Sequence, residues 1–173
     1  TTLENRLRLI GRVMESVRRY VGDDFPVGIR YLADEFVREG YTVEDARLIG
    51  LRMAQLGADY LSLSVGGKFE DAVHTPGHVL HAYSGYSGDR CMPGAKYPPA
   101  LHLAYAEQIR AFVRGKGYDV PIIAAGKLSD PRVAEEALVS GKLDMVAIAR
   151  GLLADPDWVR KVRLGALDRI VEC

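Results

Sequence analysis

The sequence is poor in cysteine and contains no long apolar run. Its two cysteines, Cys91 and Cys173, lie far apart in a chain of 173 residues. Such spacing without a secretory signal argues against a disulfide framework. No apolar run approaches the roughly 18 residues of a spanning helix, and the N-terminus lacks the apolar core of a signal peptide. We therefore expect a cytoplasmic protein with no membrane partner.

The chain also lacks an excess of charge of either sign. Lys plus Arg and Asp plus Glu number 23 each, so the formal net charge is zero. This balance gives no reason to expect a nucleic-acid partner, and the arginines of the first predicted helix spread around its polar side. The content of 48% hydrophobic and 27% charged residues is typical of a folded globular domain.

Apolar residues recur with two periodicities along the chain. Helical spacing predicts amphipathic helices over residues 1–21, 42–56, 101–113, 131–138 and 156–164. Short apolar runs predict strands over residues 26–31, 59–64, 121–126 and 145–149. Nearly continuous apolar strands that alternate with helices indicate an α/β fold, with a parallel sheet covered by helices.

The strand entries suggest a repeated unit. The first and third strands are entered through Pro26 and Pro121, and the second and fourth through a Gly-then-Asp turn that ends in Asp59 and Asp144. Four βα units are half of a (β/α)8 barrel, which needs about 250 residues. The chain opens inside a predicted helix entry and stops on Cys173, so we expect a cut segment. A small open doubly wound sheet is the alternative, although no Gly-rich dinucleotide fingerprint follows the first strand.

A long loop over residues 65–99 separates the second predicted strand from the third predicted helix. It contains His74, His78 and His81, a run that raises the possibility of zinc. The predicted loop offers no helix to align these imidazoles, so we favour a substrate-binding or lid element. Cys91 is interpreted as a loop thiol, because no nucleophile signature surrounds it.

Three segments of the chain match a known family. They are Leu3-Glu4-Asn5-Arg6, residues 21–30 and residues 144–156. Together they resemble the NADH:flavin oxidoreductases of the old yellow enzyme family. The resemblance implies that residues 1–173 are part of an FMN-binding (β/α)8 barrel. The four predicted strands would be strands 5 to 8, the C-terminal half of a TIM barrel.

The resemblance also assigns cofactor-binding residues. Arg30, at the end of its strand, would face the pyrimidine edge of the flavin, where a cation stabilises negative charge on reduction. Gly126, Ala149, Arg150 and Gly151 would surround the FMN phosphate after the last two strands. The alternative is a strand-end ion pair for Arg30, turn glycines at 126 and 151, and a surface cation at 150. Ala149 departs from the glycine that is usual in the family and tightens the approach to the phosphate.

The end of the chain resembles the segment that leads into an iron–sulfur centre in the dienoyl-CoA and enoate reductases of this family. Cys173 would then be the first ligand of a 4Fe-4S cluster in a full-length parent. Three further ligands would be needed, so this chain alone could not hold the cluster. The alternative is an ordinary terminal thiol.

The family relation implies a function for the parent protein. A hydride from NADH or NADPH would pass to FMN and then to the activated C=C bond of an enone, an enoate or an enoyl-CoA-like substrate. The family's catalytic His pair and Tyr come from earlier strands, so we assign no catalytic residue here and expect an inactive isolated chain. Homo-oligomerisation, or pairing with the missing barrel half, would cover its open edges. Two alternatives are a non-catalytic half-barrel that binds a phosphate ligand or self-associates, and another phosphate-binding barrel enzyme.

Overall fold

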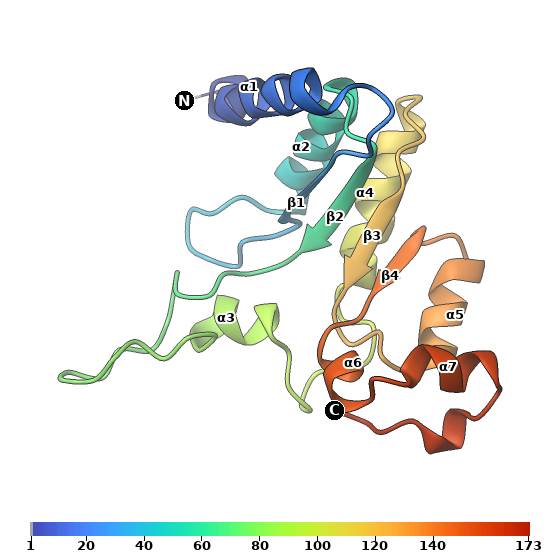
Figure 1. Ribbon diagram of the computed structural model, residues 1–173. Coiled ribbons are helices and arrows are strands. Elements are labelled where there is room, and N and C mark those ends of the chain that lie inside the picture. The colour runs from blue at the N-terminus through green and yellow to red at the C-terminus, as the bar shows by residue number, and fades with distance from the viewer. Residues whose placement is uncertain (1) are drawn as a thin grey trace.

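The computed structural model describes residues 2–173. The strands within this range form one four-stranded parallel sheet. Its strands are β1 (Gly28–Leu32), β2 (Tyr60–Ser64), β3 (Ile122–Ala125) and β4 (Met145–Ala147). They lie side by side in chain order (Figure 1). A doubly wound sheet would reverse its strand order partway, whereas consecutive parallel neighbours are the arrangement of a TIM barrel. The fold is therefore the predicted half of a (β/α)8 barrel.

Helices precede, connect and follow the strands, close to where the periodicity predicts them. They are α1 (Leu3–Val21), α2 (Val43–Gln55), α4 (Leu103–Gly115), α5 (Pro131–Val139) and α7 (Trp158–Arg163). Three short elements were not predicted, α3 (Gly85–Cys91), α6 (Arg150–Ala154) and the 3₁₀ turn η1 (Leu167–Arg169). The last strand stops at residue 147 rather than 149, because the chain turns there to enter α6.

Two helix starts are capped as the sequence indicates. The Thr2 hydroxyl accepts the Asn5 amide at 3.3 Å and so opens α1. Asp130 accepts the Arg132 amide at 2.9 Å, with Pro131 in the first turn of α5. Each cap satisfies an amide that has no partner within its own helix.

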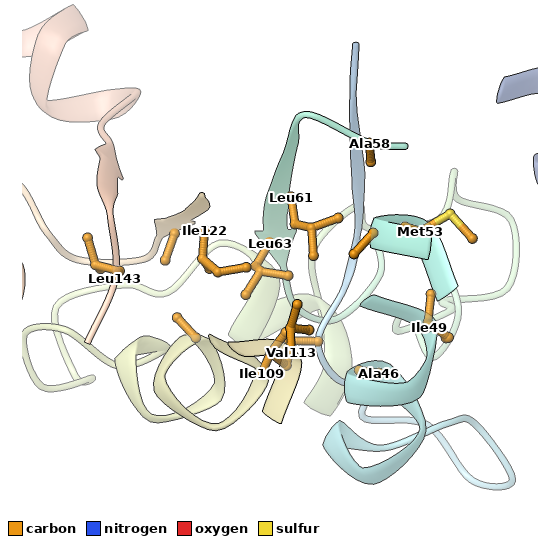
Figure 2. Packing of buried hydrophobic residues seen from close by; sticks show 14 of the residues in the cluster. Ala46, Ile49, Met53, Ala58, Leu61, Leu63, Ile109, Val113, Ile122 and Leu143 are labelled. Carbon is orange, nitrogen blue, oxygen red and sulfur yellow. The ribbon is translucent and has the colours of Figure 1, made fainter. Parts of the chain in front are cut away.

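The core lies between the sheet and the pair α2 and α4. Figure 2 shows Leu61 and Leu63 of β2 and Ile122 of β3 on the same side as Ile109 and Val113 of α4. These five side chains are almost fully buried. Strand residues alternate between faces, so the neighbours of the buried residues, such as Ser62, point to the opposite face of the sheet. That face is the interior in a closed barrel.

The sequence repeat at the strand entries corresponds to a repeated set of hydrogen bonds, in which an aspartate accepts from a backbone amide and from an arginine. Asp59 Oδ2 accepts the Val27 amide and Arg18 Nη2, both at 2.7 Å. Asp144 Oδ2 accepts the Ile122 amide at 2.9 Å and Arg110 Nε at 3.1 Å.

In each half of the chain, therefore, an arginine of one helix and an aspartate at a strand entry clamp two neighbouring strands. The same arginines extend the clamp to the turn before the second strand of each pair. Arg18 donates to the carbonyl of Gly57 and Arg110 to that of Gly141. These bonds fix the strand register at the end of the sheet opposite the site.

Residues 65–99 are not wholly irregular, because they contain α3 (Gly85–Cys91). The part before α3 extends away from the body of the molecule (Figure 1). Ser87, which is buried, anchors the helix by accepting the Gly67 amide at 2.8 Å and donating to the Glu35 carbonyl. Arg90 stacks on the Tyr86 ring at 3.4 Å. The segment has no apolar periodicity, so the helix gave no signal in the sequence.

Candidate functional site

A cavity of about 290 Å³ opens at the C-terminal ends of the strands. Its wall contains every residue that the sequence analysis assigned to a site, namely Arg30, Gly126, Ala149, Arg150, Gly151 and Cys173. Gly126, Ala149, Arg150 and Gly151 follow the ends of β3 and β4, and Cys173 is the chain terminus. Arg30 is the middle residue of β1 and not the end of its strand as predicted, because the strand runs from Gly28 to Leu32. The C-terminal end of the strands is where (β/α)8 barrels build their active sites. The fold thus gathers distant parts of the sequence around one hollow.

The cavity wall is positively charged. Among the described residues that line it, Arg30, Lys127 and Arg150 are cationic and none has an acidic side chain. Cations around a partly enclosed space favour an anionic ligand, because the attraction is screened less there than on an open surface. The arrangement therefore suits a phosphate or another compact anion.

Arg30 occupies the side of the cavity formed by β1. It lies opposite Ser62 in the strand register and donates through Nη1 to the Ser62 hydroxyl at 2.8 Å. No carboxylate pairs with it among residues 2–173, so it does not form the strand-end ion pair considered as the alternative. A guanidinium has five N–H donors. Most of them are left for a ligand in the cavity.

Both its backbone conformation and a close neighbour exclude a side chain at Gly126. Its φ is +117°, which side chains rarely tolerate. A Cβ at this position would lie 2.1 Å from Nδ1 of His102, behind the cavity wall. A side chain would therefore collide first with His102 and only indirectly disturb a ligand.

The end of β4 is packed just as closely. Gly151 is buried, and a Cβ there would lie 2.9 Å from Cβ of Ser129. Ala149 is the residue before α6 and makes no capping hydrogen bond with its side chain. The amides of Arg150 and Gly151 belong to the first turn of α6, where N–H groups have no partner within the helix. This strand end thus presents backbone donors and the Arg150 guanidinium together.

A strap of residues 92–97 closes one side of the cavity, and its role was missed from the sequence. Arg150 Nη2 donates to the Pro93 carbonyl at 2.8 Å. Lys127 Nζ donates to the carbonyls of Gly94 at 3.2 Å and Tyr97 at 2.6 Å. The two cations therefore join the tips of β3 and β4 to the strap. The signal available was Lys127 itself, a cation directly after the glycine already assigned to the site.

Two thiols lie on the cavity wall. Burial raises the pKa of Cys91, with a further upward contribution from Glu70 that outweighs the opposing effect of Arg30. Cys91 is therefore a neutral thiol at physiological pH. Cys173 is exposed, and its tail is held where the Val171 amide donates to Asp155 Oδ2 at 2.8 Å.

The histidines of the long segment do not form a metal site with their neighbours. His74, His78 and His81 are exposed on the extended part before α3. Within residues 2–173, no group of three or more His, Cys, Asp or Glu side chains is arranged to hold a metal ion. Over the same residues, no helix has the length and apolarity that a bilayer crossing requires.

Comparisons with known proteins agree with this geometry. Residues 92–168 match the NADH:flavin oxidoreductase / NADH oxidase family. The cinnamate reductase of Clostridium sporogenes is 32% identical over 99% of this chain and 25% of its own length. The N,N-dimethylglycine/sarcosine dehydrogenase of Chromohalobacter salexigens is also 32% identical, over 99% of this chain and 22% of its own length.

A solved structure supports the same relation. A complex of 2-naphthoyl-CoA reductase with 2-naphthoyl-CoA superposes with a TM-score of 0.80 and 26% identity, over 100% of this chain and 23% of the reductase. The chain spans about a quarter of the length of the curated relatives it matches. Sequence, fold and the position of the cavity agree, and they relate the chain to the NADH:flavin oxidoreductase / NADH oxidase family.

Proposed function

We propose that the cavity binds FMN, with its phosphate at the tips of β3 and β4 and its pyrimidine edge toward Arg30. The observation that carries this proposal is the meeting of β1 with the ends of β3 and β4 around one hollow that is lined, among the residues described, by three cations and no acidic side chain. In (β/α)8 barrels the loops after strands seven and eight commonly hold phosphate through backbone amides. Here β3 and β4 correspond to those two strands.

Each cavity residue then has a physical task. The amides of Gly126, Arg150 and Gly151 would donate to phosphate oxygens, and the Arg150 and Lys127 side chains would neutralise its charge. Arg30 would place a fixed positive charge beside the flavin pyrimidine, where electron density increases on reduction. Bound FMN would supply the hydride-transfer chemistry, while this chain supplies binding and orientation.

The substrate class of the whole protein is a further proposal. We infer NAD(P)H-dependent reduction of an activated C=C bond, because relatives include a cinnamate reductase and a 2-naphthoyl-CoA reductase. The similarity to an N,N-dimethylglycine/sarcosine dehydrogenase keeps oxidation of a methylated amine as the competing reaction. No catalytic acid is assigned to this chain, so it contributes the flavin site, and the acid comes from other parts of the barrel. A 4Fe-4S cluster with Cys173 as one ligand belongs to the same proposal.

Titration of the chain with FMN and with riboflavin tests the flavin site. Flavin fluorescence reports binding, and the two ligands differ only in the phosphate. We expect FMN to bind at least about tenfold more tightly, the effect of one or two charge-assisted hydrogen bonds. Equal affinities would place the phosphate outside the site and contradict the proposal.

A barrel completed from a relative tests the activity. The chain would be fused behind the preceding barrel half of the cinnamate reductase. The product would be assayed for NADH oxidation with cinnamate and, without NADH, for bleaching of the flavin by N,N-dimethylglycine, which would donate its electrons to FMN. We expect a yellow protein that oxidises NADH in the presence of the unsaturated acid. A fusion that binds FMN but transfers no hydride would favour a non-catalytic phosphate-binding module instead.

A further inference from the structure

His102 lies directly behind the cavity wall and has no task in the site described above. It is the residue before α4, and only 7% of its surface is exposed. It does not line the cavity itself, but it touches the tip of β3, which does. A buried histidine beside a ligand site needs a physical explanation, because histidine is rarely chosen to fill a core.

The ring is bonded to the peptide that leads into Gly126. Nδ1 of His102 lies 3.1 Å from the Ala125 carbonyl oxygen. A carbonyl can only accept, so Nδ1 carries the proton of this bond. Two residues earlier, the Ala100 amide donates to the Lys127 carbonyl at 2.9 Å. The segment before α4 therefore holds the backbone on both sides of Gly126.

In this position one ring nitrogen of His102 is left without a hydrogen-bond donor from the described residues. Nε2 is buried and accepts no hydrogen bond among residues 2–173, because the Arg90 carbonyl near the ring has no proton to donate. Burial lowers the pKa of His102 and outweighs the carbonyls of Ala125 and Arg90, which favour the protonated form, so the ring is neutral near pH 7. A leucine of similar size would avoid the unpaired acceptor. What leucine lacks is the N–H group that binds the Ala125 carbonyl.

Peptide geometry links that bond to the ligand site. The C=O of Ala125 and the N–H of Gly126 belong to one planar peptide, and no cis bond occurs among residues 2–173. In a trans peptide the two groups point in opposite directions. A carbonyl held toward His102 therefore turns the Gly126 N–H away from the ring. Gly126 lines the cavity and His102 does not, so the ring and the cavity meet this residue at different places.

We propose that His102 is a positioning residue, which fixes the Ala125–Gly126 peptide so that the Gly126 N–H points at the anion in the cavity. This inference rests on the proposed flavin site and adds a residue to it that touches no ligand. The ring sets the peptide orientation by its hydrogen bond, and by its contact with Gly126 it excludes any side chain there.

Two substitutions separate the hydrogen bond from the bulk of the ring. His102→Asn retains a donor near the position of Nδ1, whereas His102→Leu fills the space without a donor. We expect the FMN dissociation constant to rise about tenfold in the Leu variant and less than about threefold in the Asn variant. Riboflavin, which lacks the phosphate, should bind all three proteins equally. Equal FMN affinity in the Leu variant and the unsubstituted chain would overturn the proposal, as would parallel losses of FMN and riboflavin binding.

A second measurement on the ligand-free chain distinguishes failure of this inference from failure of the flavin site. The residual dipolar coupling of the Gly126 N–H reports the direction of that bond. We expect it to change in His102→Leu and to be preserved in His102→Asn, with the Met53 coupling in the core unchanged in both. If the Leu variant does not fold, His102→Ala serves in its place. An unchanged Gly126 coupling overturns the positioning role, whereas a changed coupling in a chain that does not prefer FMN over riboflavin refutes only the flavin site.

Discussion

At the scale of single residues, the site depends on groups whose neighbours leave them available. Within the described part of the chain, Arg30 is bonded only to the Ser62 hydroxyl, and Lys127 and Arg150 are bonded only to backbone carbonyls of the strap. Such bonds hold the cations in place without neutralising them. An anion that enters the cavity therefore meets positive charge that no carboxylate of its wall has cancelled.

Removal of the Arg30 guanidinium is the first prediction at this scale. Arg30→Ala should weaken FMN binding about tenfold, because a charged hydrogen bond to the flavin is lost while the fold is not disturbed. Flavin fluorescence titration measures the effect. Arg38→Ala is the matched control, since the Arg38 side chain is 93% exposed and away from the cavity. Identical affinities for the Arg30 variant and the control would remove Arg30 from the site.

The second prediction at this scale concerns the addition of a side chain at residue 126. Gly126→Ala should lower the free energy of unfolding by about 1–3 kcal/mol, through the collision with His102 and the unfavourable φ. Urea denaturation measures the change. Gly115→Ala in α4 meets no atom within 4 Å and serves as the control, with no loss expected. A Gly126 variant as stable as this control would contradict the prediction, because it would show that the backbone at the tip of β3 moves to accept a side chain at little cost.

At the scale of the elements, the paired Asp–Arg clamps hold the strands in register. Partial burial alone would raise the pKa of Asp144. Hydrogen bonds from Arg110 and the Ile122 amide, together with the charges of Arg110 and Arg114, outweigh burial, so its pKa lies below the ordinary value. The ionised carboxylate is thus the form that stabilises the folded chain.

A pH-dependent stability difference follows from that shift. Asp144→Asn should destabilise the chain by about 1–3 kcal/mol at pH 7. Because the folded-state pKa is lowered, the contribution is complete above the ordinary Asp pKa of about 4 and is lost as the pH falls below it. Thermal unfolding of Asp144→Asn and of the unsubstituted chain, each followed from about pH 3 to about pH 7, measures how their difference in stability changes around the ordinary Asp pKa. Asp119→Asn, at a side chain 86% exposed, should show little effect. A stability difference between Asp144→Asn and the unsubstituted chain that stays constant with pH would rule out the Asp144 charge as its cause.

The elements also show what sequence could and could not predict. Periodicity located the four strands and the helices between them, because each buries one apolar face. The predicted ends of β3 and β4 located the residues after them at the cavity, since parallel strands end on the same side of a sheet, whereas Arg30 reaches it from the middle of β1. The strap and α3 were missed because side-chain bonds to backbone carbonyls hold them, and these bonds leave no pattern in the sequence. His102 was missed for the same reason.

At the scale of the whole molecule, the sheet is open and part of its outer surface is apolar. β1 and β4 each pair with a single strand within residues 2–173. On α1, Leu9 is 72% exposed and Tyr20 is 87% exposed, with Val13 between them. Apolar stripes of this kind mark surfaces that contact another element. In a closed barrel, α1 would lie beside the helix of the preceding βα unit.

Self-association through α1 is the prediction at this scale. The combined variant Leu9→Gln, Val13→Gln, Tyr20→Gln should shift the chain toward monomer, because it removes apolar area without altering the buried side of the helix. Sedimentation velocity measures the oligomeric state. The control replaces Val139 and Leu164, which are 78% and 71% exposed on other elements, by glutamine. If the control dissociates the chain as much as the α1 variant, α1 is not the contact surface.

Binding of the FMN phosphate at the tips of β3 and β4 is the central claim, and amide NMR tests it most directly. FMN would be titrated into ¹⁵N-labelled chain, with riboflavin in a parallel sample. We predict that FMN shifts the amide signals of Gly126, Arg150 and Gly151 together, and that riboflavin shifts them far less. Signals of these three residues that stay unmoved at saturating FMN, or that move equally with riboflavin, would contradict the account.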